Sequence, residues 1–169
     1  MSTRQPRGAG AAADALAEVA PLVSRWIERL LPAHRPPLTL AQYLALRALA
    51  DNAQGAAELA RRTGVSEPAV SQLVATLAAA GLVERRAAAE DRRRHELVLT
   101  RAGRRALASA RALVRERLTP VLEDLPPPEA DALSRALPQV EALLSGTAPP
   151  RRPPPRPPHH RGRPRPGRP

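Results

Sequence analysis

Apolar side chains recur every three or four positions along much of the chain, which is the spacing of one face of an α-helix. In the N-terminal part this pattern predicts a helix over residues 11–31, within which Pro21 marks either a kink or the true start. Residues 34–37 break the pattern. Thr39 is then suited to cap a second helix, whose apolar positions continue to Leu49.

A turn over residues 51–55 leads into two shorter helices. The first is expected over residues 56–63 and ends at Gly64, a residue that readily adopts the left-handed conformation closing many helices. The second runs from Ser66, a good N-cap residue, to about Ala80. Its inner face has i, i+3, i+4, i+7 spacing and consists of Val70, Leu73, Val74 and Leu77. The pair reads as a helix–turn–helix.

After Gly81 the apolar spacing changes to two, which indicates β-strands. One strand is expected over residues 82–86 and its partner over residues 96–100, so residues 87–95 form the charged tip of a hairpin.

Two helices follow the hairpin. Thr100 is suited to cap a long helix with apolar positions up to Leu125, where three consecutive prolines interrupt it. The last helix is expected over residues 129–144, with Pro138 weakening its pattern.

This order of elements predicts a mainly α fold with a small β-hairpin wing. We expect a winged helix–turn–helix over residues 38–100, flanked by terminal helices over residues 11–31 and 101–145 that are long and apolar for a DNA-binding domain alone. Residues 1–10 and 147–169 are expected to be disordered, since the latter hold ten prolines, seven arginines and almost nothing apolar.

Composition excludes several classes of protein. All 27 basic residues are arginine and the net charge is +11. The absence of cysteine excludes a disulfide framework, a thiolate nucleophile and a cysteine-ligated zinc site. With one tryptophan, one tyrosine and no phenylalanine, a β-sandwich or barrel fits poorly. The bias toward alanine, arginine, proline and glycine indicates a GC-rich bacterial genome.

Targeting and catalytic signals are also missing. No run of about 18 apolar residues suggests a membrane span, and the N-terminus lacks a convincing signal-peptide cleavage site. A cytoplasmic protein is therefore expected. The four histidines do not pair at helical spacing, and no nucleophile–base group or glycine-rich phosphate loop occurs. We expect no enzyme activity, no cofactor and no metal site.

The outer face of the second helix of the pair carries short, mostly polar side chains, which let a helix enter the major groove of DNA. Gln72 can pair with adenine, and Glu67 can accept from cytosine N4, although a carboxylate near phosphates needs a donor. An ordinary helical hairpin with a polar solvent face is the alternative. The candidate base-reading residues are Ser66, Glu67, Ala69, Ser71, Gln72 and Thr76.

The hairpin tip is the second candidate DNA contact. Arginines on a β-hairpin can lie along a duplex and enter the minor groove, where negative potential is concentrated. A carboxylate there can pair with a neighbouring arginine and fix the loop. The candidates are Asp91, Arg92, Arg93 and Arg94. A solvated charged turn is the alternative, but the adjacent helix–turn–helix favours DNA binding.

Several motifs at these spacings resemble the MarR family of multiple antibiotic resistance regulators, without a gap over about residues 38–107. They are Leu38-Thr39-Leu40-Ala41-Gln42-Tyr43, Glu58-Leu59-Ala60, Gly64-Val65-Ser66, Val70-Ser71-Gln72-Leu73-Val74, Gly81-Leu82-Val83, Asp91-Arg92-Arg93 and Leu99-Thr100-Arg101-Ala102-Gly103. The flanking helices match in pattern only, and the proline-rich tail is no part of the family pattern.

The resemblance implies a homodimeric winged-helix transcription factor whose terminal helices form the dimer interface. It aligns Arg93 with the wing arginine that enters the minor groove, Asp91 with the aspartate of the same motif, and residues 66–72 with the start of the recognition helix. The stretch Arg94-His95-Glu96 departs from the small or apolar residues that are commoner in the family.

Many relatives in this family bind small aromatic acids or lipophilic compounds between the dimer helices and the winged domain. A cationic side chain beside an aromatic ring suits a phenolic carboxylate. The residues expected near such a cleft are Trp26, His34, Arg35, Tyr43 and Arg47. Alternatively, Trp26 and Tyr43 are core or interface residues.

We therefore expect a homodimeric repressor that binds a pseudo-palindromic operator in double-stranded DNA and is released by a small aromatic or lipophilic effector. Its recognition helices would enter successive major grooves about 34–36 Å apart. A sequence-nonspecific architectural protein that uses the arginine-rich tail is the alternative. A third hypothesis is an interaction module whose PxxP spacings are read by a proline-binding partner.

Overall fold

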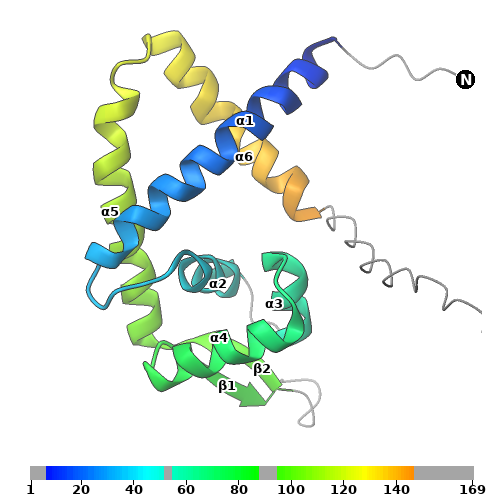
Figure 1. Ribbon diagram of the computed structural model, residues 1–169, viewed down its shortest axis with the longest axis vertical. Coiled ribbons are helices and arrows are strands. Elements are labelled where there is room, and N and C mark those ends of the chain that lie inside the picture. Colours follow the sequence, from blue (N-terminus) through cyan, green and yellow to red (C-terminus); the bar gives the residue numbers. More distant parts are fainter. Residues whose placement is uncertain (1–6, 52–54, 88–94, 147–169) are drawn as a thin grey trace, which may run out of the picture.

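The computed structural model describes residues 7–51, 55–87 and 95–146 (Figure 1). Within these ranges the chain is mostly helical, with one antiparallel hairpin, which confirms the expected fold class. The elements are α1 (Arg7–Leu30), the short 3₁₀ helix η1 (Leu31–Ala33), α2 (Leu40–Asp51), α3 (Ala56–Thr63), α4 (Glu67–Ala79), β1 (Val83–Ala87), β2 (His95–Leu99), α5 (Arg101–Leu122) and α6 (Pro127–Gly146).

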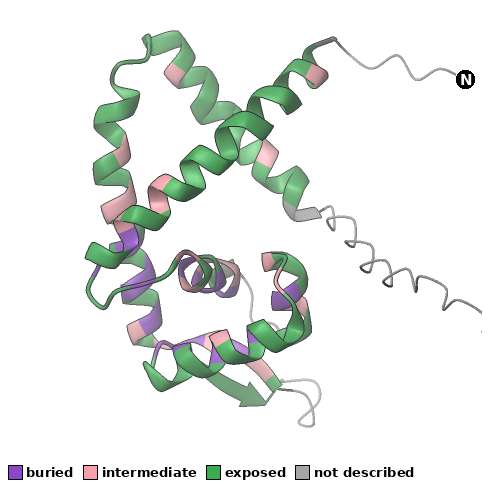
Figure 2. Ribbon diagram, in the orientation of Figure 1, coloured by how far each residue is buried: buried purple, intermediate pink, exposed green. Residues whose placement is uncertain are grey.

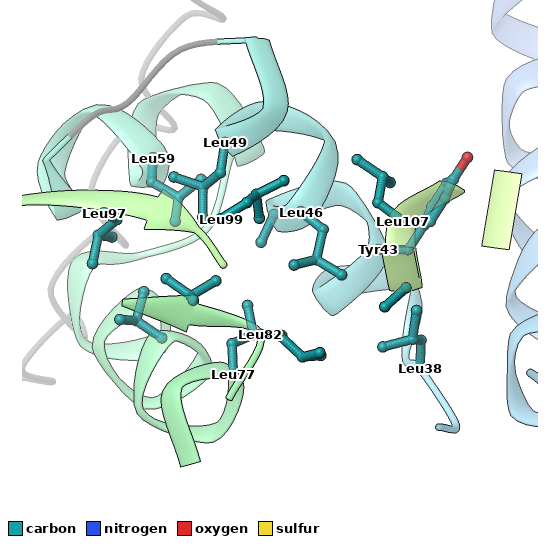
Figure 3. Packing of buried hydrophobic residues seen from close by; sticks show 14 of the residues in the cluster. Leu38, Tyr43, Leu46, Leu49, Leu59, Leu77, Leu82, Leu97, Leu99 and Leu107 are labelled. Atoms are coloured by element: carbon teal, nitrogen blue, oxygen red, sulfur yellow. The ribbon is translucent and has the colours of Figure 1, made fainter. Parts of the chain in front are cut away.

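One hydrophobic core lies among α2, α3, α4, the hairpin and the N-terminal half of α5, and we call this part the lobe (Figure 3). Its largest fully buried side chains are leucine and valine, as expected for a chain so poor in aromatic residues: Leu31, Leu46, Leu59, Leu77, Val70 and Val74. Tyr43 is buried at the edge of this core, near Leu38 and Leu107 (Figure 3).

The hairpin pairs Val83 with Leu99 at its open end and Ala87 with His95 at the end where the chain connects the two strands. Both strands are shifted by one residue from the expected bounds. Thr100 does not extend β2, because its side chain caps α5 by accepting a hydrogen bond from the Gly103 amide at 3.0 Å. The inward positions Val83, Leu97 and Leu99 are buried as the alternation predicted.

A close backbone contact joins the lobe's hairpin to α5. The Thr100 hydroxyl donates to the Gly81 carbonyl at 2.7 Å, and a Cβ built on Gly103 would overlap the carbonyl oxygen of Leu82. Glycine at position 103 therefore lets α5 approach the start of β1. Gly81 itself turns the chain out of α4 with a φ of +69°.

The terminal helices differ from the expected ones in bounds and in burial. α1 begins at Arg7, so residues 7–10 are helical rather than disordered, and it continues through Pro21. α5 ends at Leu122, four residues before the first of the three prolines. α6 begins at Pro127, because the first turn of a helix needs no intrahelical N–H partner.

Most large apolar side chains of these terminal helices are exposed in the single chain (Figure 2). α1, α6 and the C-terminal half of α5 extend away from the lobe, and α6 returns toward α2 at its far end (Figure 1). The exposed apolar positions include Leu16, Val19, Leu22, Val23, Val121, Leu122, Leu125, Leu133 and Leu137. The helical spacing is as predicted, and this chain's own core does not cover these apolar positions.

Candidate nucleic-acid interface

The turn between α3 and α4 has the tight geometry that a helix–turn–helix requires. Gly64 follows α3 with φ 69° and ψ 15°, the left-handed conformation that favours glycine. The Thr63 hydroxyl donates to the Leu59 carbonyl at 2.7 Å, and Val65 packs against the core. The turn expected from the sequence is therefore formed at the expected residues.

α4 separates into a buried and an exposed face, as its spacing predicted. Val70, Val74 and Leu77 are buried, and Leu73 is partly buried. The six predicted base-reading residues are all exposed: Ser66, Glu67, Ala69, Ser71, Gln72 and Thr76. The exposed face thus presents short or polar side chains without a bulky apolar group.

Details at the two ends of this face go beyond the sequence pattern. Ser66 occupies the N-cap position with extended backbone, but its side chain makes no capping hydrogen bond, contrary to expectation. Pro68 fills the first turn, where no intrahelical N–H partner is needed. The Thr76 hydroxyl donates to the Gln72 carbonyl at 3.0 Å. Glu67 forms no ion pair with any residue that the structure describes, so its carboxylate is available for an external donor.

A charged cluster on α3 links the supporting helix to α2. Arg61 donates to both carboxylate oxygens of Glu58, at 2.6 and 2.8 Å, and this hydrogen bonding holds the pKa of Glu58 below its usual value. The same contact raises the pKa of Arg61. Arg62 lies 3.8 Å from Glu58 and donates to the Ala48 carbonyl of α2 at 3.2 Å. The i, i+3 and i, i+4 spacing of these residues on α3 brings their charges together.

The predicted wing-tip residues Asp91, Arg92, Arg93 and Arg94 lie outside the described residues. The strands that lead to the tip are described, and Arg85 and Arg86 of β1 are both exposed, on opposite faces of the strand. Arg86 pairs with Glu84 at 2.7 Å. The two strands lie beside α4 (Figure 1), and the exposed part of β1 is rich in arginine.

The structure places the five predicted effector residues in different surroundings. Tyr43 is a core residue, as the alternative held, and Trp26 is half-buried on α1. Arg47 forms an ion pair with Glu141 of α6 at 2.6 Å. His34 is buried and is bonded to the Pro36 carbonyl and to the Ser109 hydroxyl, each at 2.6 Å. Of the five, Arg35 alone belongs to the cleft described next.

An open cleft of about 410 Å³ lies beside α5. Its lining comes from the loop after η1, from the turn between α4 and β1, and from α5: Arg35, Pro36, Ala80, Leu82, Ala102, Arg105, Ala106 and Ser109. The four α5 residues have i, i+3, i+4, i+7 spacing, so they share one face of the helix. Sequence reasoning missed Arg105 and Ser109, because that face meets the other two segments only in three dimensions.

Within residues 7–51, 55–87 and 95–146, no helix is long and apolar enough to cross a membrane. Over the same residues, no three histidine, cysteine, aspartate or glutamate side chains cluster as metal ligands would.

Comparison with family models gives one match. Residues 37–94 match the model of the MarR family, a segment that contains α2, the helix–turn–helix and β1. A comparison with curated proteins finds no match.

Solved structures resemble the chain over most of its length. A MarR family protein from Bacillus stearothermophilus is 19% identical with a TM-score of 0.68, covering 85% of this chain and 99% of that one. The MarR family protein Rv2887 from Mycobacterium tuberculosis, in complex with p-aminosalicylic acid, is 28% identical with a TM-score of 0.63, covering 76% and 97%. CouR from Rhodococcus jostii RHA1, bound to p-coumaroyl-CoA, is 23% identical with a TM-score of 0.61, covering 78% and 90%. These matches include the flanking helices as well as the lobe.

Proposed function

We propose that this chain, whose residues 37–94 match the MarR family and whose fold resembles that of its solved members, is a winged-helix transcriptional regulator that binds a pseudo-palindromic operator as a sequence-specific repressor. The observation that carries the proposal is α4. Its buried stripe anchors it to the lobe, its exposed face offers short or polar side chains, and strands β1 and β2 lie beside it (Figure 1). Such a helix fits the major groove. A regulator of this kind acts in the cytoplasm, where the bacterial chromosome lies.

In the proposed complex, Gln72 pairs with an adenine and Glu67 accepts from a cytosine N4 amino group. Ser66, Ala69, Ser71 and Thr76 pack along the same groove. At the wing, Arg93 enters the flanking minor groove, and Asp91 holds the arginine-rich loop together with Arg92 and Arg94. The exposure of the α4 residues supports the first part, and the alignment of the wing motif with the family supports the second.

We propose that the active form is a homodimer. The exposed leucines and valines of α1, α5 and α6 lie on helices that extend away from the lobe, and a second copy of the chain would cover them. Apolar helix faces of this length are uncommon on the surface of a monomer. Two-fold symmetry would then present two recognition helices about 34–36 Å apart, one helical turn of DNA.

A small-molecule effector is proposed to relieve DNA binding. Two relatives were solved with organic anions, p-aminosalicylic acid in Rv2887 and p-coumaroyl-CoA in CouR. In this chain α5 connects the lobe to the terminal helices, so a ligand beside α5 would change the spacing of the two lobes of a dimer. Recognition helices at the wrong spacing cannot enter successive major grooves together.

The test is binding of the full-length protein to its own upstream DNA and to a shuffled copy at physiological salt. A preference of about a thousandfold or more supports a specific regulator. The same measurement on residues 1–146 addresses the alternative, an architectural protein whose affinity comes from the seven arginines of the tail. Equal, salt-sensitive binding to both duplexes that vanishes without the tail favours the architectural protein.

The wing assignment predicts a defined loss. Arg93→Ala should weaken operator binding by about 1–3 kcal/mol, if the arginine makes a minor-groove contact comparable to a base contact. Arg25→Ala removes the same charge from α1 and serves as the control. Operator affinity that is unchanged at fixed salt in the Arg93 variant contradicts the assignment.

A further inference from the structure

The cleft beside α5 lies where three parts of the chain meet: the loop that leaves η1, the turn that leaves α4, and the first half of α5. We propose that this cleft binds a small aliphatic carboxylate, with the anionic group between Arg35 and Arg105 and the hydrocarbon part against the apolar wall. This inference deepens the effector part of the proposed function by assigning a site and a ligand class to it.

The charge in the cleft is entirely positive. Arg35 and Arg105 are its two charged residues, and no carboxylate lines it. Arg105 forms neither an ion pair nor a hydrogen bond with any residue in the part of the chain that the structure describes. Arg61, Arg62 and Arg86 are by contrast each paired with a glutamate. Two guanidinium groups without a counter-charge at one cleft favour a carboxylate, which matches their planar donor geometry.

The Arg35 side chain is oriented by hydrogen bonds to backbone carbonyl groups of the preceding residues. Its guanidinium donates to the carbonyl oxygens of Pro32, Ala33 and His34 at 3.4, 3.4 and 3.1 Å. These contacts use one terminal nitrogen, Nη1. They orient the side chain without neutralising its charge, since the acceptors are uncharged carbonyl groups.

A buried hydrogen-bond chain holds the Arg35 loop against α5. His34 is 5% exposed; its Nδ1 donates to the Pro36 carbonyl, and its Nε2 shares a hydrogen bond with the Ser109 hydroxyl. Ser109 is itself a lining residue, one helical turn beyond Arg105. The two arginines are therefore brought to the same cleft before any ligand arrives, which reduces the ordering cost of binding.

The remaining wall favours a hydrocarbon chain. It consists of small aliphatic groups: Pro36, Ala80, Leu82, Ala102 and Ala106. No aromatic ring lines the cleft, because Tyr43 is buried in the core and Trp26 lies on α1. Burial of methylene groups then provides the apolar part of the affinity, about 0.8 kcal/mol per fully buried CH₂, without ring stacking.

The site is connected to the recognition helix. Ala80 and Leu82 directly follow α4, and the Thr100 hydroxyl bond to Gly81 and the contact at Gly103 join this turn to α5. A ligand that bridges the Arg35 loop and α5 therefore acts on the same turn that ends the recognition helix. This connection makes operator release by the ligand the expected outcome.

The experiment is calorimetric titration of the full-length protein with octanoate, with benzoate and inorganic phosphate as comparison anions. We expect octanoate to bind more tightly than either. Arg105→Gln should weaken octanoate binding at least tenfold, and Arg35→Gln should do the same. Arg117→Gln removes one charge from an exposed α5 position outside the cleft, and its affinity should equal that of the wild type.

The inference is overturned if Arg105→Gln and Arg35→Gln bind octanoate as the wild type does. It is also overturned if phosphate binds as tightly as octanoate, which shows charge attraction alone, or if benzoate binds more tightly. Operator binding is measured on the same preparations. Specific operator binding that octanoate does not weaken overturns the inference but leaves the proposed repressor intact, whereas release in the wild type and not in Arg105→Gln supports both.

Discussion

The lobe and the terminal helices are built from the same kinds of residue but differ in how far those residues are buried. In the lobe, leucines at helical spacing are buried, as Leu46 and Leu77 show. In α1 and α6, leucines at the same spacing are exposed, as Leu16 and Leu137 show (Figure 2). The pattern is equally helical in both regions. The difference shows that helical spacing identifies the apolar face of a helix. It does not show whether that face is covered by the same chain or by another one.

This contrast has an energetic consequence. The lobe buries its apolar side chains within one chain, so its folding free energy contains their full transfer from water. The terminal helices gain little of that within one chain, since isolated helices are stabilised mainly by packing of an apolar face. Substitutions of the same type should therefore have unequal effects in the two regions.

The largest effect is expected for a core leucine of the lobe. Leu46→Ala should lower the free energy of unfolding by about 2–5 kcal/mol, because it removes a fully buried side chain and leaves a cavity. Urea denaturation of the full-length protein measures it. Leu44→Ala lies two residues away on α2 at 39% exposure and provides the matched control. Equal losses in the two variants would contradict the packing described for α2.

A glycine in each region allows a second test. Gly103→Ala places a methyl group against the carbonyl of Leu82, so we expect a loss of about 1–3 kcal/mol from forced displacement of α5. Gly10→Ala makes the same change in α1, where nothing lies within 4 Å of the added Cβ. It should stabilise the helix by roughly 0.5–1 kcal/mol. Thermal unfolding of both variants checks the signs, and a neutral Gly103→Ala would contradict the close approach of α5 to β1.

The terminal helices should respond in assembly rather than in folding of the lobe. Leu137→Glu places a charge on the exposed apolar face of α6, and in the proposed homodimer it should weaken self-association about tenfold or more, which is ~1.4 kcal/mol. Sedimentation analysis over a range of concentrations measures this. Gln139→Glu adds the same charge at an exposed position that does not share a face with Leu137, and it should leave self-association unchanged. Identical sedimentation of wild type and Leu137→Glu would remove support for α6 as a dimer element.

The same contrast explains how far the sequence could predict the structure. Most predictions from a few neighbouring residues were correct: Gly64 closes α3, Thr100 caps α5 and the hairpin alternates as expected, although Ser66 makes no capping hydrogen bond. Prolines were less informative, since Pro21 lies within a continuous helix and Pro127 begins one. A proline ends a helix when its missing N–H and its ring conflict with the preceding turn, and a first turn has no such conflict.

The candidate site divides along similar lines. The exposed face of α4 follows from spacing alone, so all six predicted residues were placed correctly on it. The cleft depends on three segments separated by tens of residues, and spacing within α5 gave no indication that Arg105 would meet Arg35. Arg47 appeared suited to a ligand and instead pairs with Glu141, a partner 94 positions away.

The smallest expected effect distinguishes ionic contacts on the lobe surface from its apolar core. Arg61 lowers the pKa of Glu58, so the folded state favours the carboxylate. The resulting stabilisation is complete above the ordinary carboxyl pKa of about 4.3 and is lost as the pH falls through the lowered folded-state pKa. The difference in unfolding free energy between wild type and Glu58→Gln should therefore be small at pH 7 and vanish in acid.

Urea unfolding at pH 7 and at about pH 3, below the ordinary carboxyl pKa, measures this difference, and added salt should reduce it at pH 7 because the pair is exposed. Arg61→Gln removes the guanidinium group that lowers the pKa of Glu58, so it should abolish the same pH dependence. If the difference between wild type and Glu58→Gln instead grew in acid, the carboxyl group would be stabilised in its protonated form, and the hydrogen bonds from Arg61 would not be the dominant interaction. Since neither substitution touches Leu46 or Leu77, the cooperativity of unfolding should stay that of the wild type, and the apolar core of the lobe would remain the part that decides whether it folds.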